Sequence, residues 1–169
     1  MKSKLNPKLS FAGAALVLAA SITGVVGAQT LPKEGPFEFT SCWNGTATPI
    51  VFSKTHSAAT FEIVGSMRST PSGGMFDNNS FRCVGMNSVF DGKKSESLVC
   101  ETIDKDGDKR LGRYVSTPDG KLIRETILVT GKYEGMVETT TVTTLGPFPV
   151  IRVGTFHGCN QQKGTYKLK

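Results

Sequence analysis

The chain has 169 residues, with 20 Lys and Arg against 14 Asp and Glu, and a formal net charge of +6. Three basic residues, Lys2, Lys4 and Lys8, lie in an N-terminal leader, so 20 minus 3 leaves 17 basic against 14 acidic residues, a net charge of +3. No run of Lys or Arg lies beside aromatic side chains, so we expect no nucleic-acid partner and interpret the basic residues as solvated surface.

Residues 1–28 have the pattern of a secretory signal peptide. The basic residues come first, residues 9–26 carry no charge, and the segment ends in the small residues that a signal peptidase reads. A membrane anchor is the alternative, but no basic stop-transfer run follows. We therefore expect a periplasmic or secreted protein whose mature part, residues 29–169, is one β-barrel domain with no membrane partner.

The first part of this domain contains two apolar runs, an alternating segment and a turn-rich loop. Residues 37–43 are expected to form a first strand, and residues 49–54 either an edge strand or a loop. Residues 59–67 alternate apolar and polar side chains, which predicts a half-buried strand. Residues 69–80, rich in Ser, Gly, Asp and Asn, predict a loop.

Three Asp-Gly pairs, which begin at Asp91, Asp106 and Asp119, punctuate residues 81–129. Such a pair between alternating apolar and polar residues is a strong signal for a β-hairpin, because a type I′ turn needs positive φ at both central residues. The pattern predicts four antiparallel strands joined by tight turns.

The last third of the chain continues the β pattern. Residues 131–136 are too rich in glycine for a strand and predict a tight connection, and strands are expected at 137–145, 149–157 and 164–168. The fold class that we expect is all-β, a single antiparallel up-and-down barrel of about eight strands. A Greek-key sandwich is the alternative, but it needs longer crossing connections.

The four cysteines predict two disulfides in an exported domain. If the pair that begins at Asp91 is a two-residue turn, Cys83 lies opposite Cys100 in a non-hydrogen-bonded pair, where side chains approach closely. Cys42 then pairs with Cys159. Zinc is the competing interpretation, but no Cys-x-x-Cys or His spacing supports it.

Two short motifs resemble a known family. The acidic turn at 104–109, Tyr114 and the Gly-Lys-Tyr-Glu-Gly-Met segment at 131–136 are similar to small secreted bacterial proteins with an allene oxide cyclase-like, calycin-type barrel. The chain departs from that pattern at Val129 and Glu138, where glycines are common. The resemblance implies an eight-stranded barrel with an apolar interior; the active-site residues of the plant cyclases cannot be matched to this chain.

Asp104, Asp106 and Asp108, with Gly107 among them, suggest calcium. An EF-hand loop, however, needs its glycine at the sixth position and a Glu at the twelfth, whereas here the glycine is fourth and Val115 is twelfth. A solvated hairpin tip explains these residues better, so we expect no metal and no cofactor.

The same counting of opposed residues, continued through the next two turns, places a mixed set of side chains on one face of the sheet. These ligand-pocket candidates are Arg82, Val84, Met86, Val99, Glu101, Tyr114, Ile123, Glu125 and Ile127. If this face lines the interior, Arg82 pairs with Glu101 and Tyr114 with Glu125, and buried carboxylates indicate a ligand or acid–base chemistry. A register slip of one residue would instead turn such charges to water.

No reaction signature is present, so the catalytic residues, if any, are unknown. We consider three functions. The first is binding of a small hydrophobic or amphipathic ligand inside the barrel without catalysis. The second is an isomerase or cyclase that uses the polar cluster of Glu101, Tyr114 and Glu125. The third is a structural or partner-binding module with a solid barrel, recognised through the loop at 69–80.

Overall fold

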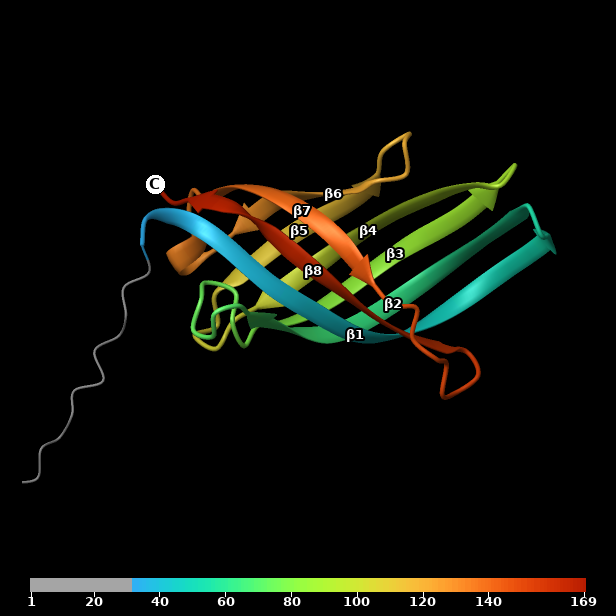
Figure 1. Ribbon diagram of the computed structural model, residues 1–169, viewed down its shortest axis with the longest axis horizontal. Coiled ribbons are helices and arrows are strands. Elements are labelled where there is room, and N and C mark those ends of the chain that lie inside the picture. The colour runs from blue at the N-terminus through green and yellow to red at the C-terminus, as the bar shows by residue number, and fades with distance from the viewer. Residues whose placement is uncertain (1–31) are drawn as a thin grey trace, which may run out of the picture. The chain divides into compact units, whose positions relative to one another are not determined.

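The computed structural model describes residues 32–169, so the expected signal peptide and its cleavage point lie outside the described residues. Eight antiparallel strands form one sheet that curls into a nearly closed barrel, with one short 3₁₀ turn, η1 (Figure 1). The elements are β1 (Glu34–Ser53), β2 (His56–Ser69), β3 (Ser80–Phe90), β4 (Lys93–Ile103), β5 (Lys109–Ser116), β6 (Leu122–Val129), η1 (Gly131–Tyr133), β7 (Val137–Leu145) and β8 (Thr155–Lys167). The predicted all-β barrel with two disulfides is confirmed.

Two predicted strand assignments are wrong. Residues 37–43 and 49–54 belong to one long strand, β1, which pairs with β2 along most of its length. Residues 149–154 form a loop, and strand β8 begins only at Thr155 and continues to Lys167, so the strand expected at 164–168 is not a separate one. Pro147 and Pro149 lack a backbone N–H, which explains why the chain cannot join a ladder there in spite of its apolar composition.

The β3–β4 hairpin has the register that its sequence predicts. Both residues of the Asp-Gly pair at 91–92 have positive φ, 52° and 74°, as a two-residue type I′ turn requires. Cys83 therefore lies opposite Cys100, and the two form a disulfide inside the barrel. The second predicted disulfide, Cys42–Cys159, is also present and joins β1 to β8 on the outer face, where Cys42 is exposed.

The other two Asp-Gly turns differ from the prediction by one residue. In each, only the glycine has positive φ, 89° at Gly107 and 81° at Gly120, so the loop has three residues and the glycine forms a bulge. Glu101 consequently lies opposite Leu111, and Tyr114 turns to the other face of the sheet. The second three-residue turn shifts the register once more, so Glu125 lies opposite Arg113 instead of Tyr114 and β6 keeps its predicted face.

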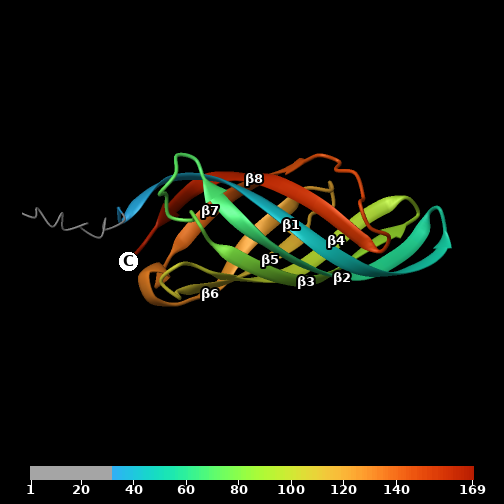
Figure 2. The same cartoon turned by 90° about the horizontal axis from the view of Figure 1, so that it is seen from below.

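Aromatic side chains fill one end of the barrel, where Figures 1 and 2 both place the green loop between β2 and β3. Phe39, Phe76 and Tyr133 come from β1, this loop and η1, and each is fully buried. The guanidinium of Arg110 lies over two of these rings, 4.1 Å from the Phe76 centroid and 5.1 Å from the Tyr133 centroid. Burial lowers the pKa of Arg110 to about 10, and the ring faces stabilise its charge.

The acidic turn between β4 and β5 is fastened to η1. The Asp104 carboxylate accepts hydrogen bonds from the backbone N–H groups of Asp106 and Asp108, at 2.8 and 3.1 Å, and from the Tyr133 hydroxyl at 2.9 Å. The Lys132 ammonium lies 2.7 Å from Asp104 and 2.6 Å from Asp106. The carboxylates of Asp104 and Asp106 therefore hold Lys132 against the turn. The acidic motif at 104–109 and the glycine-rich motif at 131–136 thus have a structural role.

Gly131→Ala should destabilise the barrel more than Gly120→Ala. Both glycines have positive φ, 53° and 81°, but a Cβ at Gly131 would overlap the Asp108 carboxylate, whereas one at Gly120 meets nothing within 4 Å. We expect a loss of about 1 kcal/mol at Gly120 from backbone strain alone and of more than about 2 kcal/mol at Gly131. Urea unfolding of the two variants measures this difference, and equal losses would contradict it.

The barrel is not closed by hydrogen bonds. The sheet order is β6-β5-β4-β3-β2-β1-β8-β7, so β6 and β7 face each other as the two unpaired edges. Arg124 of β6 and Glu138 of β7 form an ion pair of 2.9 Å across this seam, with side chains only 4% and 3% exposed. The Thr126 hydroxyl donates to the same carboxylate. Side chains thus join the two edges where the backbone does not.

We expect Glu138→Ala to cost about 3–5 kcal/mol of unfolding free energy, because it leaves the Arg124 charge buried without its partner. The matched control is Glu125→Ala, which removes the carboxylate of the neighbouring Arg113–Glu125 pair, whose side chains are 51% and 58% exposed. An exposed pair contributes less than about 1 kcal/mol. Chemical denaturation of both variants provides the comparison, and similar losses would show that the seam does not depend on this pair.

Candidate functional site

The barrel contains a cavity of about 400 Å³ in the half that the aromatic rings leave open. Its floor lies against Met67 and Gln162, and its mouth lies beside Phe148 in the loop between β7 and β8. The walls are mostly apolar. They are formed by Trp43, Phe61, Ile63, Phe81, Leu98, Leu122, Phe156 and the Cys83–Cys100 disulfide.

Glycines in the strands make room for the rings that line the cavity. A Cβ at Gly65 would overlap the Phe81 ring, and a Cβ at Gly158 would overlap the Trp43 indole. Each aromatic side chain therefore packs directly over the backbone of the neighbouring strand. The cavity owes its width to this pairing of glycine with aromatic residue.

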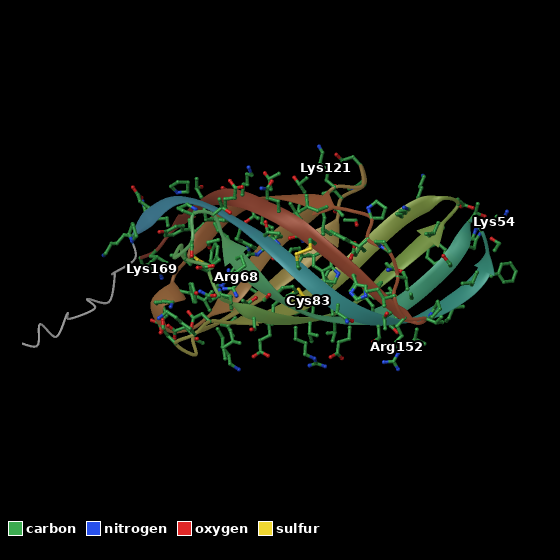
Figure 3. The ribbon with its side chains drawn as sticks, turned by 60° about the horizontal axis from the view of Figure 1, so that its bottom comes forward. Lys54, Arg68, Cys83, Lys121, Arg152 and Lys169 are labelled. Atoms are coloured by element: carbon green, nitrogen blue, oxygen red, sulfur yellow. A yellow bond between two sulfur atoms is a disulfide. The ribbon has the colours of Figure 1, made fainter. Side chains whose placement is uncertain are left out.

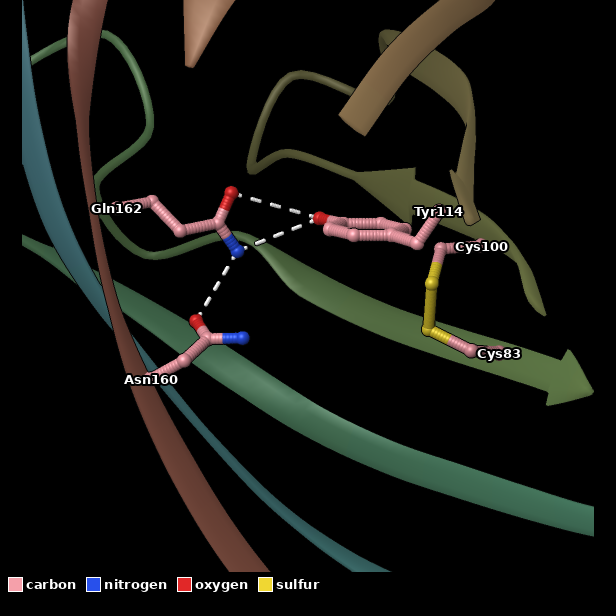
Figure 4. The surroundings of a disulfide bond; sticks show 5 residues. All are labelled: Cys83, Cys100, Tyr114, Asn160 and Gln162. Carbon is pink, nitrogen blue, oxygen red and sulfur yellow. Dashed lines mark hydrogen bonds between the residues drawn. A yellow bond between two sulfur atoms is a disulfide. The ribbon is translucent and has the colours of Figure 1, made fainter. Parts of the chain in front are cut away.

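Tyr114, Asn160 and Gln162 form a polar cluster at the cavity floor (Figure 4). The Gln162 amide nitrogen donates to the Tyr114 hydroxyl at 3.3 Å and to the Asn160 side-chain oxygen at 3.0 Å. Arg124 donates to the Gln162 amide oxygen at 3.3 Å, which links the floor to the seam between β6 and β7. The hydroxyl of Ser41, also in the lining, is buried and has no hydrogen-bond partner among the described residues.

The mouth carries a carboxylate. Glu96 of β4 lines the cavity together with Asn87 and His157, and its backbone N–H donates to the Ser116 hydroxyl at 3.0 Å. No ion pair within residues 32–169 includes Glu96, and burial raises the pKa of its carboxyl. A carboxyl in this environment is easier to protonate than an exposed one.

Of the nine residues predicted to line a pocket, the structure places only Tyr114 inside the barrel. The others lie on the outer face and are exposed; they are Arg82, Val84, Met86, Val99, Glu101, Ile123, Glu125 and Ile127. The prediction that this face lines the interior is therefore wrong, although the eight residues other than Tyr114 do share one face.

The charged members of that face form surface ion pairs. Arg82 contacts Glu62 at 2.8 Å rather than Glu101, although Arg82 and Glu101 are opposed in the ladder as predicted. Glu101 binds Lys109 at 2.7 Å. The proposed polar cluster of Glu101, Tyr114 and Glu125 is consequently not assembled.

The residues that do line the cavity belong to the row that contains the disulfide. Phe81 precedes Cys83 by two residues, and Leu98 precedes Cys100 by two, so all four side chains point the same way. Half-cystines and phenylalanines are commonly buried, whereas Arg and Glu are not. The cysteines and phenylalanines on one face, against the Arg and Glu on the other, are the sequence signal that identifies the interior face.

Searches of protein-family models, of curated proteins and of solved structures find no match to this chain. The resemblance to allene oxide cyclase-like proteins therefore stays a prediction. Within residues 32–169, no helix has the length and apolar character needed to cross a bilayer.

Glu96→Gln should make the protein more stable at neutral pH. Because the folded-state pKa of Glu96 is raised, ionisation penalises the folded state above the unfolded-state pKa, and this penalty disappears below it. The variant should therefore exceed the parent in unfolding free energy at pH 7 and equal it near pH 3. Urea denaturation at both pH values tests this, and a variant that is less stable at pH 7 would contradict the assigned cause.

Proposed function

We propose that the barrel binds one small amphipathic molecule in its interior cavity, with the apolar part against the ring-lined walls. A volume of about 400 Å³ lies within the range of about 300–1,000 Å³ that is usual for small-molecule sites. Such sites combine mostly apolar walls with a few polar groups that orient the ligand, and both features are present here.

The observation that carries the proposal is the buried hydroxyl of Ser41. This side chain is 2% exposed, borders the cavity and lacks a hydrogen-bond partner within the described residues. A buried hydroxyl without a partner costs free energy, and rotation of the short Ser41 side chain toward the cavity would let a ligand oxygen satisfy it as donor or acceptor. With the amides of Asn160 and Gln162 nearby in the lining, a neutral carbonyl or hydroxyl group fits the floor better than a charged one.

An isomerase or cyclase is the second candidate, and Glu96 is the observation that favours it. A carboxyl whose pKa is raised by burial at the mouth of a cavity is suited to proton transfer. Turnover of an unsaturated fatty-acid epoxide by the protein, lost in Glu96→Gln while ligand binding persists, would support catalysis. Equal turnover by both proteins, or none by either, would leave binding alone.

The proposed place of action is the periplasm or the cell exterior. Two disulfides are compatible with an oxidising compartment, and the N-terminal pattern predicts export. The third hypothesis, a solid module recognised through the loop at 69–80, loses support for two reasons. The barrel has a cavity, and this loop inserts Met75 and Phe76 into the core.

Leu122→Trp should abolish ligand binding, because Leu122 lines the cavity near its mouth and a larger side chain would occupy the space. The matched control is Ile127→Trp on the same strand, where the native side chain is 52% exposed on the outer face. Titration with the neutral, carbonyl-bearing dye 6-propionyl-2-(dimethylamino)naphthalene should give saturable binding to the parent and to the control, with at least about tenfold weaker binding to Leu122→Trp. Absence of saturable binding to the parent would refute the proposal.

A further inference from the structure

The end of the barrel at which the cavity opens carries two groups of exposed apolar side chains. One lies in the last residues of β1 before the turn to β2, with Ile50, Val51 and Phe52, and Phe52 is 91% exposed. The other is the loop between β7 and β8, where Ile151 and Val153 are 88% and 97% exposed. Large apolar side chains at such exposure mark a contact surface when they gather at one end of a molecule.

Basic side chains accompany both groups. Lys54 follows Phe52 in the β1–β2 turn, and Arg152 lies between the two exposed residues of the other loop. Lys93 and Lys94 begin β4, and the Gly92 backbone N–H donates to the Thr55 carbonyl at 3.5 Å, which places this turn beside the first. None of these four basic residues belongs to an ion pair within residues 32–169.

Both groups lie in the half of the barrel in which the cavity opens, although neither belongs to its lining. Thr46 of β1 pairs with Thr155 of β8, so the β7–β8 loop emerges beside β1, which then continues to the β1–β2 turn. Figure 3 shows Lys54 and Arg152 in the half of the molecule away from Lys169, and the opposite end is filled by aromatic rings. Phe148, at the start of the β7–β8 loop, itself lines the cavity.

From this arrangement we propose that the open end of the barrel docks on an anionic lipid bilayer, with the two apolar groups inserted at the headgroup level and the four basic side chains against lipid phosphates. Two groups of apolar side chains, each flanked by unpaired Lys or Arg, match the chemistry of an anionic interface. A protein partner would be met by a packed apolar centre with few charges, which these separate tips do not form. The sequence predicts no membrane partner for residues 29–169 because the apolar leader has the pattern of a cleaved signal peptide with no stop-transfer run.

Sedimentation with vesicles tests the docking without any cavity ligand, so it is independent of the proposed function. The chain that begins at Gln29 is used, because the apolar leader would itself bind lipid and because all strands, both disulfides and the core lie within residues 32–169. We expect binding to vesicles of phosphatidylglycerol and phosphatidylcholine at low salt. Binding should weaken as the salt concentration rises and should be much weaker to phosphatidylcholine alone.

Two double variants and one control separate the contributions. Ile151→Ser combined with Val153→Ser should remove most of the binding, whereas Val137→Ser, which changes a 71% exposed valine near the closed end, should leave it unchanged. Lys54→Gln with Arg152→Gln should reduce binding to anionic vesicles about thirtyfold, from the attraction expected for two basic residues at such a surface.

Three results would overturn the proposal. The first is no sedimentation of the folded protein with either kind of vesicle. The second is an equal loss of binding in Val137→Ser and in the loop variants. The third is self-association of the protein in light scattering that Ile151→Ser with Val153→Ser abolishes, since the apolar tips would then form an interface between copies of the chain. Circular dichroism of each variant verifies that its barrel is folded.

Discussion

The barrel depends on one buried ion pair because its sheet has two edges that no hydrogen-bond ladder joins. Arg124 and Glu138 meet across this seam, and Arg124 also reaches Gln162 at the cavity floor. A buried charge is tolerated only when its ionic and hydrogen-bonding partners are in place, so this ion pair fixes how close β6 and β7 lie. The position of β7 against β6, and with it the shape of the cavity wall, follows from that contact.

The interior on either side of this contact serves two different purposes. Toward the closed end, the Arg110 guanidinium and the rings of Phe76 and Tyr133 fill the space, and the loop between β2 and β3 seals it. Toward the open end, the walls stay apart, and polar side chains lie at the floor and at the mouth of the cavity. One half of the barrel is therefore filled by side chains, and the other half contains an open cavity.

The fold could be predicted from the sequence because the signals for hairpins are local. The interior face could not, because it depends on counting opposed residues through successive turns, and an error at one turn shifts every later pair. The turn at 91–92 has the predicted two residues and sets Cys83 opposite Cys100. The turns with Gly107 and Gly120 have a third residue, since only the glycine takes positive φ, and Tyr114 is reversed as a result. The prediction of the interior face is wrong for a separate reason. The face with Arg82 mixes charged and apolar side chains, whereas the opposite face carries half-cystines and aromatic side chains, which are typically buried. Long-range features such as the seam pair and the Ser41 hydroxyl have no local sequence signal.

The glycines beneath the cavity's rings have a consequence for recognition. Because the Trp43 indole rests on Gly158 and the Phe81 ring on Gly65, these side chains are held against backbone and cannot fold inward to collapse the void. A guest molecule would therefore enter a space whose shape already exists, and it would lose little free energy to ordering the host. Selectivity in such a host comes from fit to a fixed outline, so molecules of different width should be distinguished more sharply than molecules of different flexibility.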